Sequence, residues 1–266
     1  MKIITKSSPI GMFDSGVGGT SIFKAVQQLL PNEQVIYLAD SKNAPYGAKS
    51  KTEIIDLSFK NTQFLLDRGA KIIVVACNTA TTNAIEELRS TFKVPIIGIE
   101  PAIKPAALLS ATKVIGILAT KGTLTSELFT KTTELLAKDI ELIEVIGEGL
   151  VPLIEKGEIA SPQTKDLLIK LLQPMLVKGI DYLVLGCSHY PYLIPLIKEI
   201  LPLDVRIIDS GEAVAKQTKA VLQDAKLLYE GPKKTSIFYS NQNPKVLDYL
   251  VNKDQPETLE VSFLDF

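Results

Sequence analysis

Two cysteines are the residues of this sequence that are best placed to do chemistry. Cys77 follows the apolar run IIVVA, Cys187 follows the apolar run YLVLG, and the 266 residues contain no other cysteine. Each thiol opens a polar stretch, as expected where a buried strand turns into a helix. The partial positive charge at a helix N-terminus lowers the pKa of a nearby thiol, which then exchanges protons more readily. Two thiols on opposite sides of a carbon can invert a stereocentre, since one removes a proton and the other returns one.

Other roles for the two thiols fit the sequence less well. A free cysteine is often only a small buried apolar residue, but polar residues follow each of these at once. A structural disulfide is disfavoured in a reducing cytosol, and a redox pair more often has the closer Cys-X-X-Cys spacing. The single histidine, His189, and two cysteines cannot complete a tetrahedral zinc site without carboxylates. No metal site is expected.

The residues after the cysteines predict an anion site beside each thiol. Asn78 or Thr79 can cap the helix after the first cysteine, and Ser188 can cap the helix after the second. The unpaired amides at such a helix start attract carboxylates. Each thiol is therefore expected next to a place where an acidic substrate can bind.

The sequence also indicates an internal duplication. The segment from Ile10 to Ser15 reappears loosely from Ile115 to Thr120, and each copy then reaches a Gly-Thr pair. The offset between the copies is close to the separation of the two cysteines, which makes coincidence a poor explanation. Two similar halves are expected, each presenting one thiol.

Composition and charge exclude several classes of protein. The 29 basic and 30 acidic side chains give a formal net charge of −1, and no basic run is present, so nucleic acid is not expected as the primary ligand. The N-terminal residues lack the apolar core of a signal peptide, and no apolar stretch reaches the roughly 20 residues that span a bilayer. We expect a cytoplasmic protein without membrane contact, and a homodimer is the default assembly.

Short apolar runs alternate with longer amphipathic segments, which is typical of parallel sheets covered by helices. Strands are predicted at 9–13, 34–39, 71–76, 95–99, 113–118, 140–145, 181–185 and 204–208. Helices are predicted at 20–30, 52–67, 80–92, 124–137, 164–178 and 192–200. Gly69 and Gly179 are expected to end two of these helices in the left-handed conformation.

This pattern predicts an α/β protein with two pseudo-symmetric parallel-sheet domains and helices on both faces of each sheet. The active site is expected in the cleft between them, because ligands of such sheets bind beyond the carboxyl ends of the strands. Residues 1–100 together with 208–266 are expected to form the first domain, which carries Cys77. Residues 101–207 are expected to form the second, which carries Cys187.

The sequence resembles the glutamate racemases over essentially its whole length. The match is carried by FDSGVGG at 13–19, APYG at 44–47, ACNTAT at 76–81, PAIKPA at 101–106, VPLIE at 151–155 and LGCSHYP at 185–191. Enzymes of this family interconvert L-glutamate and D-glutamate without a cofactor, and the D-glutamate supplies bacterial peptidoglycan synthesis. The resemblance therefore implies a racemase that binds glutamate and needs no cofactor.

The same resemblance implies the catalytic residues. Cys77 and Cys187 would be the two acid-bases, assisted by Asp14, His189 and Glu155. Simpler roles are open for the three assistants. Asp14 could be a helix-capping aspartate, His189 a structural histidine, and Glu155 a solvated helix end.

The resemblance also implies a set of substrate-binding residues. They are Asp14, Ser15, Pro45, Tyr46, Gly47, Asn78, Thr79, Thr120, Ser188 and His189. The motifs place the first two beside the substrate amine, and Asn78 and Thr79 at a substrate carboxylate. Ser188 stands where the family usually has threonine, so the hydroxyl is kept and a methyl group is lost.

Other functions stay open at the level of the sequence. Aspartate is the nearest rival substrate, because specificity depends on side-chain contacts that a sequence does not place. Cys187 with His189 could be the nucleophile of a thiol amidohydrolase, which leaves Cys77 without a role. A non-catalytic amino-acid binding protein would leave both thiols unexplained.

Overall fold

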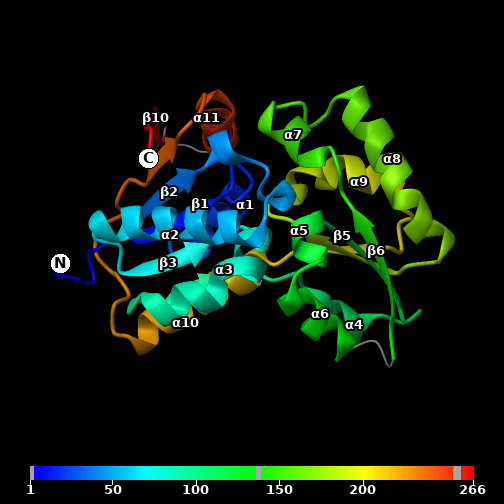
Figure 1. Ribbon diagram of the computed structural model, residues 1–266, viewed down its shortest axis with the longest axis horizontal. Helices are drawn as coiled ribbons and strands as arrows, with labels where there is room; N and C mark the ends of the chain where they lie inside the picture. Colours follow the sequence, from blue (N-terminus) through cyan, green and yellow to red (C-terminus); the bar gives the residue numbers. More distant parts are fainter. Residues whose placement is uncertain (1–2, 136–138, 254–258) are drawn as a thin grey trace.

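The strands form two separate parallel sheets, shown in Figure 1, in a computed structural model that describes residues 3–135, 139–253 and 259–266. The first sheet has the order β10-β9-β2-β1-β3-β4, and the second has the order β6-β5-β7-β8. The strands are β1 (Ile10–Asp14), β2 (Val35–Ala39), β3 (Ile72–Val75), β4 (Ile96–Gly98), β5 (Val114–Ala119), β6 (Glu141–Ile146), β7 (Tyr182–Gly186), β8 (Arg206–Ile208), β9 (Ile237–Ser240) and β10 (Glu260–Phe263).

The two sheets repeat one topology. The order β2-β1-β3-β4 in the first sheet matches β6-β5-β7-β8 in the second, strand for strand along the chain. All of these pairings are parallel. Cys77 follows β3 and Cys187 follows β7, so the thiols leave equivalent strands. The two pseudo-symmetric α/β units predicted from the sequence are therefore present, and β9 and β10 extend the first of them beyond β2.

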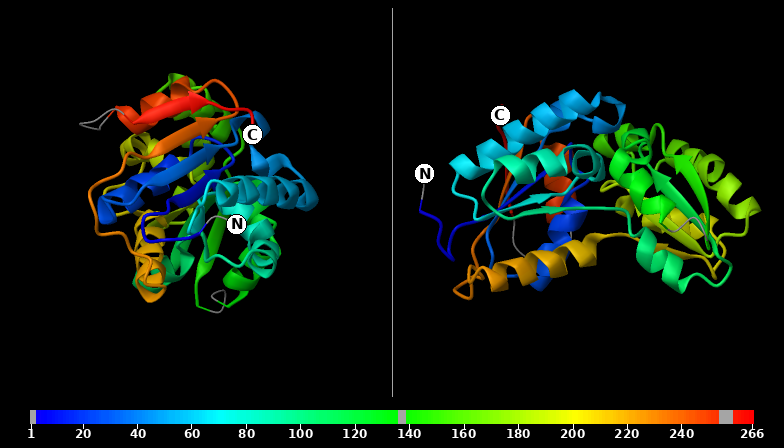
Figure 2. Two further views of the ribbon diagram at one scale, coloured as in Figure 1. Left: turned by 90° about the vertical axis from the view of Figure 1, so that its left-hand side faces the viewer. Right: turned by 60° about the horizontal axis from the view of Figure 1, so that its bottom comes forward.

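Helices cover both faces of the sheets, as Figures 1 and 2 show. We call β1 to β4, β9 and β10 with α1 to α3, α10 and α11 the first half, and β5 to β8 with α4 to α9 the second half. The helices are α1 (Thr20–Leu29), α2 (Lys51–Asp67), α3 (Asn78–Thr91), α4 (Ile103–Leu109), α5 (Lys121–Leu124), α6 (Glu127–Glu134), α7 (Leu150–Glu155), α8 (Pro162–Val177), α9 (Ile194–Ile200), α10 (Gly211–Asp224) and α11 (Lys245–Asn252). Short 3₁₀ turns are η1 (Ser41–Asn43), η2 (Tyr46–Ala48) and η3 (Tyr190–Leu193). No helix in the described ranges combines the length and apolar character needed to cross a bilayer.

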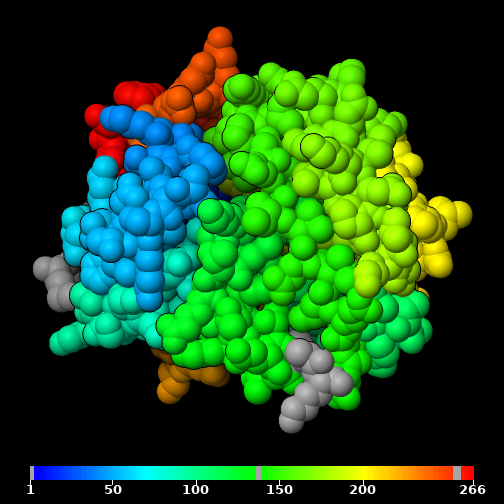
Figure 3. Space-filling model, turned by 45° about the vertical axis from the view of Figure 1, so that its right-hand side comes forward, coloured from blue at the N-terminus to red at the C-terminus, as the bar shows by residue number. Residues whose placement is uncertain are grey.

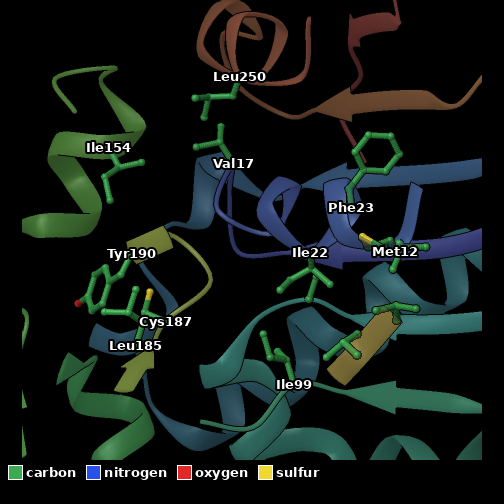
Figure 4. Close-up of a cluster of buried hydrophobic side chains, with 14 of the residues drawn as sticks. Met12, Val17, Ile22, Phe23, Ile99, Ile154, Leu185, Cys187, Tyr190 and Leu250 are labelled. Atoms are coloured by element: carbon green, nitrogen blue, oxygen red, sulfur yellow. The ribbon is translucent and has the colours of Figure 1, made fainter. Parts of the chain in front are cut away.

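Burial on both faces explains why the strands read as continuous apolar runs. Met12 of β1 packs in the same cluster as side chains of α1, α10 and α11, whereas its neighbour Phe13 packs with α2 and α3 on the other face. The larger cluster also continues into the second half. Figure 4 shows Cys187 beside Leu185 and Tyr190 at one side of that cluster. The second thiol therefore lies against a core that the two halves share.

The eight strands predicted from the sequence are all present, each with ends within two residues of the prediction. Five of the six predicted helices are present as well, the last of them as η3 followed by α9. Gly69 and Gly179 have φ values of 88° and 70° after α2 and α8, so the predicted left-handed caps are confirmed. The strands β9 and β10 and the helices α4, α7, α10 and α11 were not predicted.

The prediction of one helix over 124–137 is wrong. Helix α5 ends at Leu124 and α6 begins at Glu127, while residues 136–137 of the prediction lie outside the described part of the chain. Ser126 explains the break, because its side chain accepts a hydrogen bond from the Phe129 amide and caps a new helix.

A buried ion pair fixes the edge of the first sheet opposite the thiols. Lys71 Nζ lies 2.6 Å from Glu33 Oε2, and the two side chains are 0% and 2% exposed. The same ammonium donates to the carbonyls of Lys6 and Leu227, and Glu33 Oε1 accepts from the Tyr229 amide. Since a buried charge is tolerated only when it is paired and hydrogen-bonded, this cluster ties the segment after α10 to the first sheet.

Breaking this pair from one side should destabilise the fold strongly. Lys71→Met leaves the Glu33 carboxylate buried without its cation, and the free energy of unfolding should fall by about 3–5 kcal/mol. The matched control is Lys165→Met, because Lys165 and Glu199 are also 2.6 Å apart but 44% and 55% exposed. That change should cost less than about 1 kcal/mol. Urea unfolding of both variants measures the difference, and equal losses would contradict this account of the buried pair.

Candidate active site

Both cysteines lie at the carboxyl edges of their sheets and are nearly buried, with 3% and 6% of their surface exposed. Cys77 is the N-cap residue of α3, and its Sγ accepts a hydrogen bond of 3.4 Å from the Ala80 amide. Cys187 lies between β7 and η3. The structure therefore places the first thiol at the helix N-terminus that the sequence predicted, with a backbone donor that can hold a thiolate.

Cys187 has an imidazole and a carboxylate beside it. His189 Nδ1 lies 3.8 Å from Cys187 Sγ, and His189 Nε2 lies 2.6 Å from Glu155 Oε1. Glu155 is the last residue of α7, and its side chain is 16% exposed. The interpretation of Glu155 as a solvated residue at a helix end is therefore wrong. The carboxylate instead orients the ring next to the second thiol.

Glu155 also reaches across to the first half. Its Oε1 accepts from the Val17 amide at 2.7 Å, and its Oε2 accepts from Ser41 Oγ at 2.8 Å. The glycines of the FDSGVGG motif make room for this approach. A Cβ at Gly16 would collide with Glu155, and one at Gly18 would collide with the His189 ring. These two glycines are required by the close approach of the second half.

Asp14 connects the two thiol sites. It ends β1, is fully buried, and its Oδ2 accepts from the Gly19 amide at 2.8 Å. Its Oδ1 accepts from Ser188 Oγ of the other half at 3.1 Å, and its Oδ2 lies 3.8 Å from His189 Nδ1. The carboxylate thus caps the turn into α1 and also bonds to the motif that follows Cys187.

The electrostatics differ between the two sites. Burial raises the pKa of the Cys77 thiol well above its usual value, and the charge of Asp14 raises it further. The hydrogen bond from the Ala80 amide opposes this rise. Burial alone would lower the pKa of His189, but Asp14 and hydrogen bonds to Cys187 and Glu155 outweigh it and raise that pKa well above its usual value. Burial also raises the pKa of Asp14, opposed by His189 and the Gly19 amide. The raised pKa values favour the protonated forms of the Cys77 thiol and of the His189 ring.

A group of three threonine hydroxyls joins the halves near Cys77. Thr79 Oγ1 lies 2.8 Å from Thr120 Oγ1 and 3.3 Å from Thr123 Oγ1, and the last two are 3.0 Å apart. Thr120 caps α5, as Cys77 caps α3. A Cβ at Gly47 would lie 2.8 Å from the Thr120 Cβ, which is closer than side chains pack, so the absence of a side chain at Gly47 permits the contact.

Asn78 and Ser15 complete the buried polar lining on the Cys77 side. Asn78 is 2% exposed, and its Oδ1 has no hydrogen-bond partner among the described residues. Its Nδ2 makes one bond of 3.4 Å to the Ile99 carbonyl. Ser15 is 4% exposed, and its side chain works against the rise of the Cys77 pKa. The unpartnered amide oxygen of Asn78 can accept a hydrogen bond from a ligand.

Pro45 lies at the mouth above these residues. Two cavities of about 570 and 580 Å³ open where the halves meet, and Pro45, Val151 and Pro152 line both of them. Figure 3 shows the first half, in blue and cyan, abutting the green second half along this seam. Cys77 and Cys187 line neither cavity. The thiols are therefore covered in this conformation.

The residues proposed from the sequence come together around the two thiols. Asp14, Ser15, Asn78 and Thr79 lie on the Cys77 side, and Ser188, His189 and Glu155 on the Cys187 side. Pro45, Tyr46, Gly47 and Thr120 lie where the halves meet. In the described ranges no group of three or more His, Cys, Asp or Glu side chains is arranged to hold a metal ion.

Three residues of this region were missed by the sequence analysis: Asp40, Ser41 and Thr123. Asp40 and Ser41 directly follow the apolar run of β2. The strand-end rule that singled out the cysteines would have found them. Thr123 lies in the first turn after the cap residue Thr120, and only the structure brings its hydroxyl to Thr79.

Comparisons with known proteins agree with this geometry. The family model described as Asp/Glu/Hydantoin racemase matches residues 18–218. A glutamate racemase of Pseudomonas putida (strain W619) is 42% identical over 247 residues, which are 92% of this chain and 93% of that protein. The structure of a glutamate racemase isoform from Bacillus anthracis has a TM-score of 0.88 at 29% identity and covers 98% of both chains. A glutamate racemase from Francisella tularensis, solved in complex with D-glutamate, has a TM-score of 0.83 at 29% identity over 97% of this chain and 98% of that one. This chain belongs to the Asp/Glu/hydantoin racemase family.

Proposed function

We propose that this protein interconverts L-glutamate and D-glutamate by a two-base mechanism in which Cys77 and Cys187 are the proton acceptor and donor. The observation that carries the proposal is the placement of two buried thiols after equivalent strands of two similar half-molecules. Each thiol has its own polar partners, and Asp14 connects the two sets. Stereoinversion needs one acid-base group on each face of the reacting carbon, and this arrangement offers two.

Asp14 and Ser15 would bind the substrate amine, and Asn78, Thr79 and Thr120 a carboxylate. Ser188 would bind the substrate from the side of the second half. An ammonium beside Asp14 would offset the negative charge that contributes to the high pKa of Cys77. Substrate binding would therefore lower the cost of forming the thiolate. By family resemblance, Cys77 takes the proton of the D-isomer, while Cys187 delivers one from the other face.

His189 and Glu155 would serve the second thiol. An imidazolium 3.8 Å from Cys187 Sγ can stabilise negative charge on that sulfur, and Glu155 keeps the ring in place. Since the thiols are covered, substrate entry requires the halves to separate and then close again. We assign these moving units to residues 1–100 with 208–266 and to residues 101–207. Closure expels water and strengthens the electrostatic stabilisation of a carbanion-like state.

The wider role follows from the product. We propose that a cytoplasmic homodimer supplies D-glutamate for peptidoglycan synthesis, as the resemblance implies. The Francisella protein was solved with D-glutamate, which supports the choice of glutamate over aspartate. A thiol amidohydrolase is the weaker alternative, because it uses only the Cys187 and His189 side of the site.

The direct test is hydrogen exchange during racemisation. Purified protein incubated with L-glutamate in deuterated water under reducing conditions should lose optical rotation and gain deuterium at the α-carbon, without added cofactor. L-aspartate in a parallel incubation should stay unchanged. Exchange with aspartate but not glutamate would reassign the substrate. A trapped acyl-enzyme without α-exchange would favour amide hydrolysis.

Removal of either thiol should stop inversion and leave the fold intact. Cys77→Ala and Cys187→Ala should each reduce kcat by roughly 100-fold to 10,000-fold, the usual contribution of one acid-base group. Circular dichroism and urea unfolding check that each variant is folded. Wild-type rates of racemisation in either folded variant would rule out the two-base mechanism.

The raised pKa of His189 should appear in the pH dependence of stability. A folded-state pKa above the unfolded value of about 6.5 means that the proton stabilises the fold fully below that pH, and that the gain is lost as the pH rises through the folded pKa. The stability advantage of the wild type over His189→Asn should therefore shrink as the pH rises above about 6.5, by about 1.4 kcal/mol per unit of pKa difference. Urea unfolding at several pH values measures this. A constant difference would show that folding leaves the pKa of His189 unchanged.

A further inference from the structure

A buried carboxylate lies beneath the segment that carries Pro45, Tyr46 and Gly47. Asp40 directly follows β2 and is 1% exposed. Its Oδ2 accepts from the Tyr46 hydroxyl at 2.5 Å and from Asn61 Nδ2 at 3.4 Å. Asn61 Nδ2 also lies 3.1 Å from the Tyr46 hydroxyl. The ring of Tyr46 is thus anchored from the interior of the first half.

The other carboxylate oxygen of Asp40 is bonded from two directions. Its Oδ1 accepts from Asn43 Nδ2 at 2.8 Å and from Asn241 Nδ2 at 2.5 Å. Asn43 belongs to the same loop, but Asn241 comes from the C-terminal part of the chain. These donors are neutral amides, and the carboxylate depends on them for its solvation.

The register of the first sheet places Asn241 at this point. Strand β9 pairs with β2 so that Ser240 lies opposite Ala39, and the next residues along the two strands are Asn241 and Asp40. Asn241 is 4% exposed. Its side-chain Oδ1 accepts from the Lys42 backbone amide at 2.9 Å, and its backbone amide donates to the Ala39 carbonyl at 3.3 Å. One side chain therefore holds both the carboxylate and the backbone of the segment from 40 to 47.

That segment ends at the junction of the halves. Tyr46 is 1% exposed, and Gly47 packs against Thr120 of the second half. Pro45 lines both cavities at the mouth. A shift of Asp40 would move Tyr46 and change the position of all three residues. The thiols leave other strands, β3 and β7, and have separate hydrogen-bond partners.

We propose that Asn241 is a positioning residue for substrate binding, acting through Asp40 and Tyr46 to hold the segment from Pro45 to Gly47 against the substrate. This proposal rests on the racemase function proposed above. In the described part of the chain Asn241 bonds to Asp40 and Lys42, and to neither thiol. Its effect should therefore fall on the binding of the substrate in the ground and transition states alike, and not on the proton transfers.

The test is the steady-state kinetics of Asn241→Ala on L-glutamate and D-glutamate. KM should rise about tenfold, while kcat should stay within about threefold of the wild type, because uniform binding is lost. The matched control is Asn252→Ala. Asn252 is also an asparagine of the C-terminal part, and it bonds to the Leu259 backbone at 2.7 and 3.3 Å, away from the segment from 40 to 47. The Asn252→Ala variant should lose stability without a change in KM.

A double-mutant cycle with Tyr46→Phe separates positioning from general loosening. Once the hydroxyl that bonds to Asp40 is gone, Asn241 keeps only its bond to the Lys42 amide as a link to this segment, so the tenfold step should shrink to about twofold. Equal steps in the two backgrounds, or an unchanged KM in a folded Asn241→Ala, would overturn the proposal. Loss of kcat alone would do the same. A wild-type protein that does not racemise glutamate would instead refute the proposed function.

Discussion

The site depends on one constraint, which is that the carboxylate of Asp14 is fully buried and still has to be hydrogen-bonded. A buried charge without partners costs several kcal/mol, so the chain must bring donors to it. The Gly19 amide comes from the turn after the same strand, but Ser188 and His189 come from the other half. Satisfying this one group therefore brings the residues after Cys187 toward those around Cys77. The glycines at 16 and 18 follow from the same requirement, because the incoming His189 and Glu155 leave no space for a Cβ.

The polar contacts between the halves are directed hydrogen bonds. Asp14 of the first half faces His189 of the second half, and His189 bonds to Glu155. Glu155 in turn accepts hydrogen bonds from Ser41 and from the Val17 amide of the first half. Water can replace hydrogen bonds of this kind at low net cost, since folding only exchanges one set of partners for another. The apolar cluster behind Cys187 is a different matter, because it stays packed only while its residues exclude water. Separation at the polar mouth with retained packing behind it is the motion that this distribution favours.

The sequence was most informative where burial was most complete. Strands such as β1 and β3 are buried on both faces, so they read as unbroken apolar runs, and the polar residues at their ends stand out. Strand β9 has only alternate residues buried and β10 has none, which removed the signal. Helix α7 is six residues long, too short for its periodicity to show. Asp40 could have been found by its place after a strand. Asn241 could not, because its role depends on the register between β9 and β2, which no local pattern encodes.

The duplicated scaffold carries two unequal thiol sites, and this inequality is compatible with racemisation. Cys77 has a helix amide and Asp14 near it, whereas Cys187 has the His189 ring, whose raised pKa favours the charged form. Enantiomers have equal free energies in solution, so the equilibrium constant is unity and kcat/KM must be the same in both directions. That equality is imposed by thermodynamics and does not require the two thiols to be equally basic. The two thiol environments can therefore give the two enantiomers different kcat and KM values, provided that the ratio kcat/KM is the same for both. The symmetry needed by the reaction is therefore geometric, with one acid-base group on each face, and the repeated strand order supplies it without repeating the side chains around each sulfur.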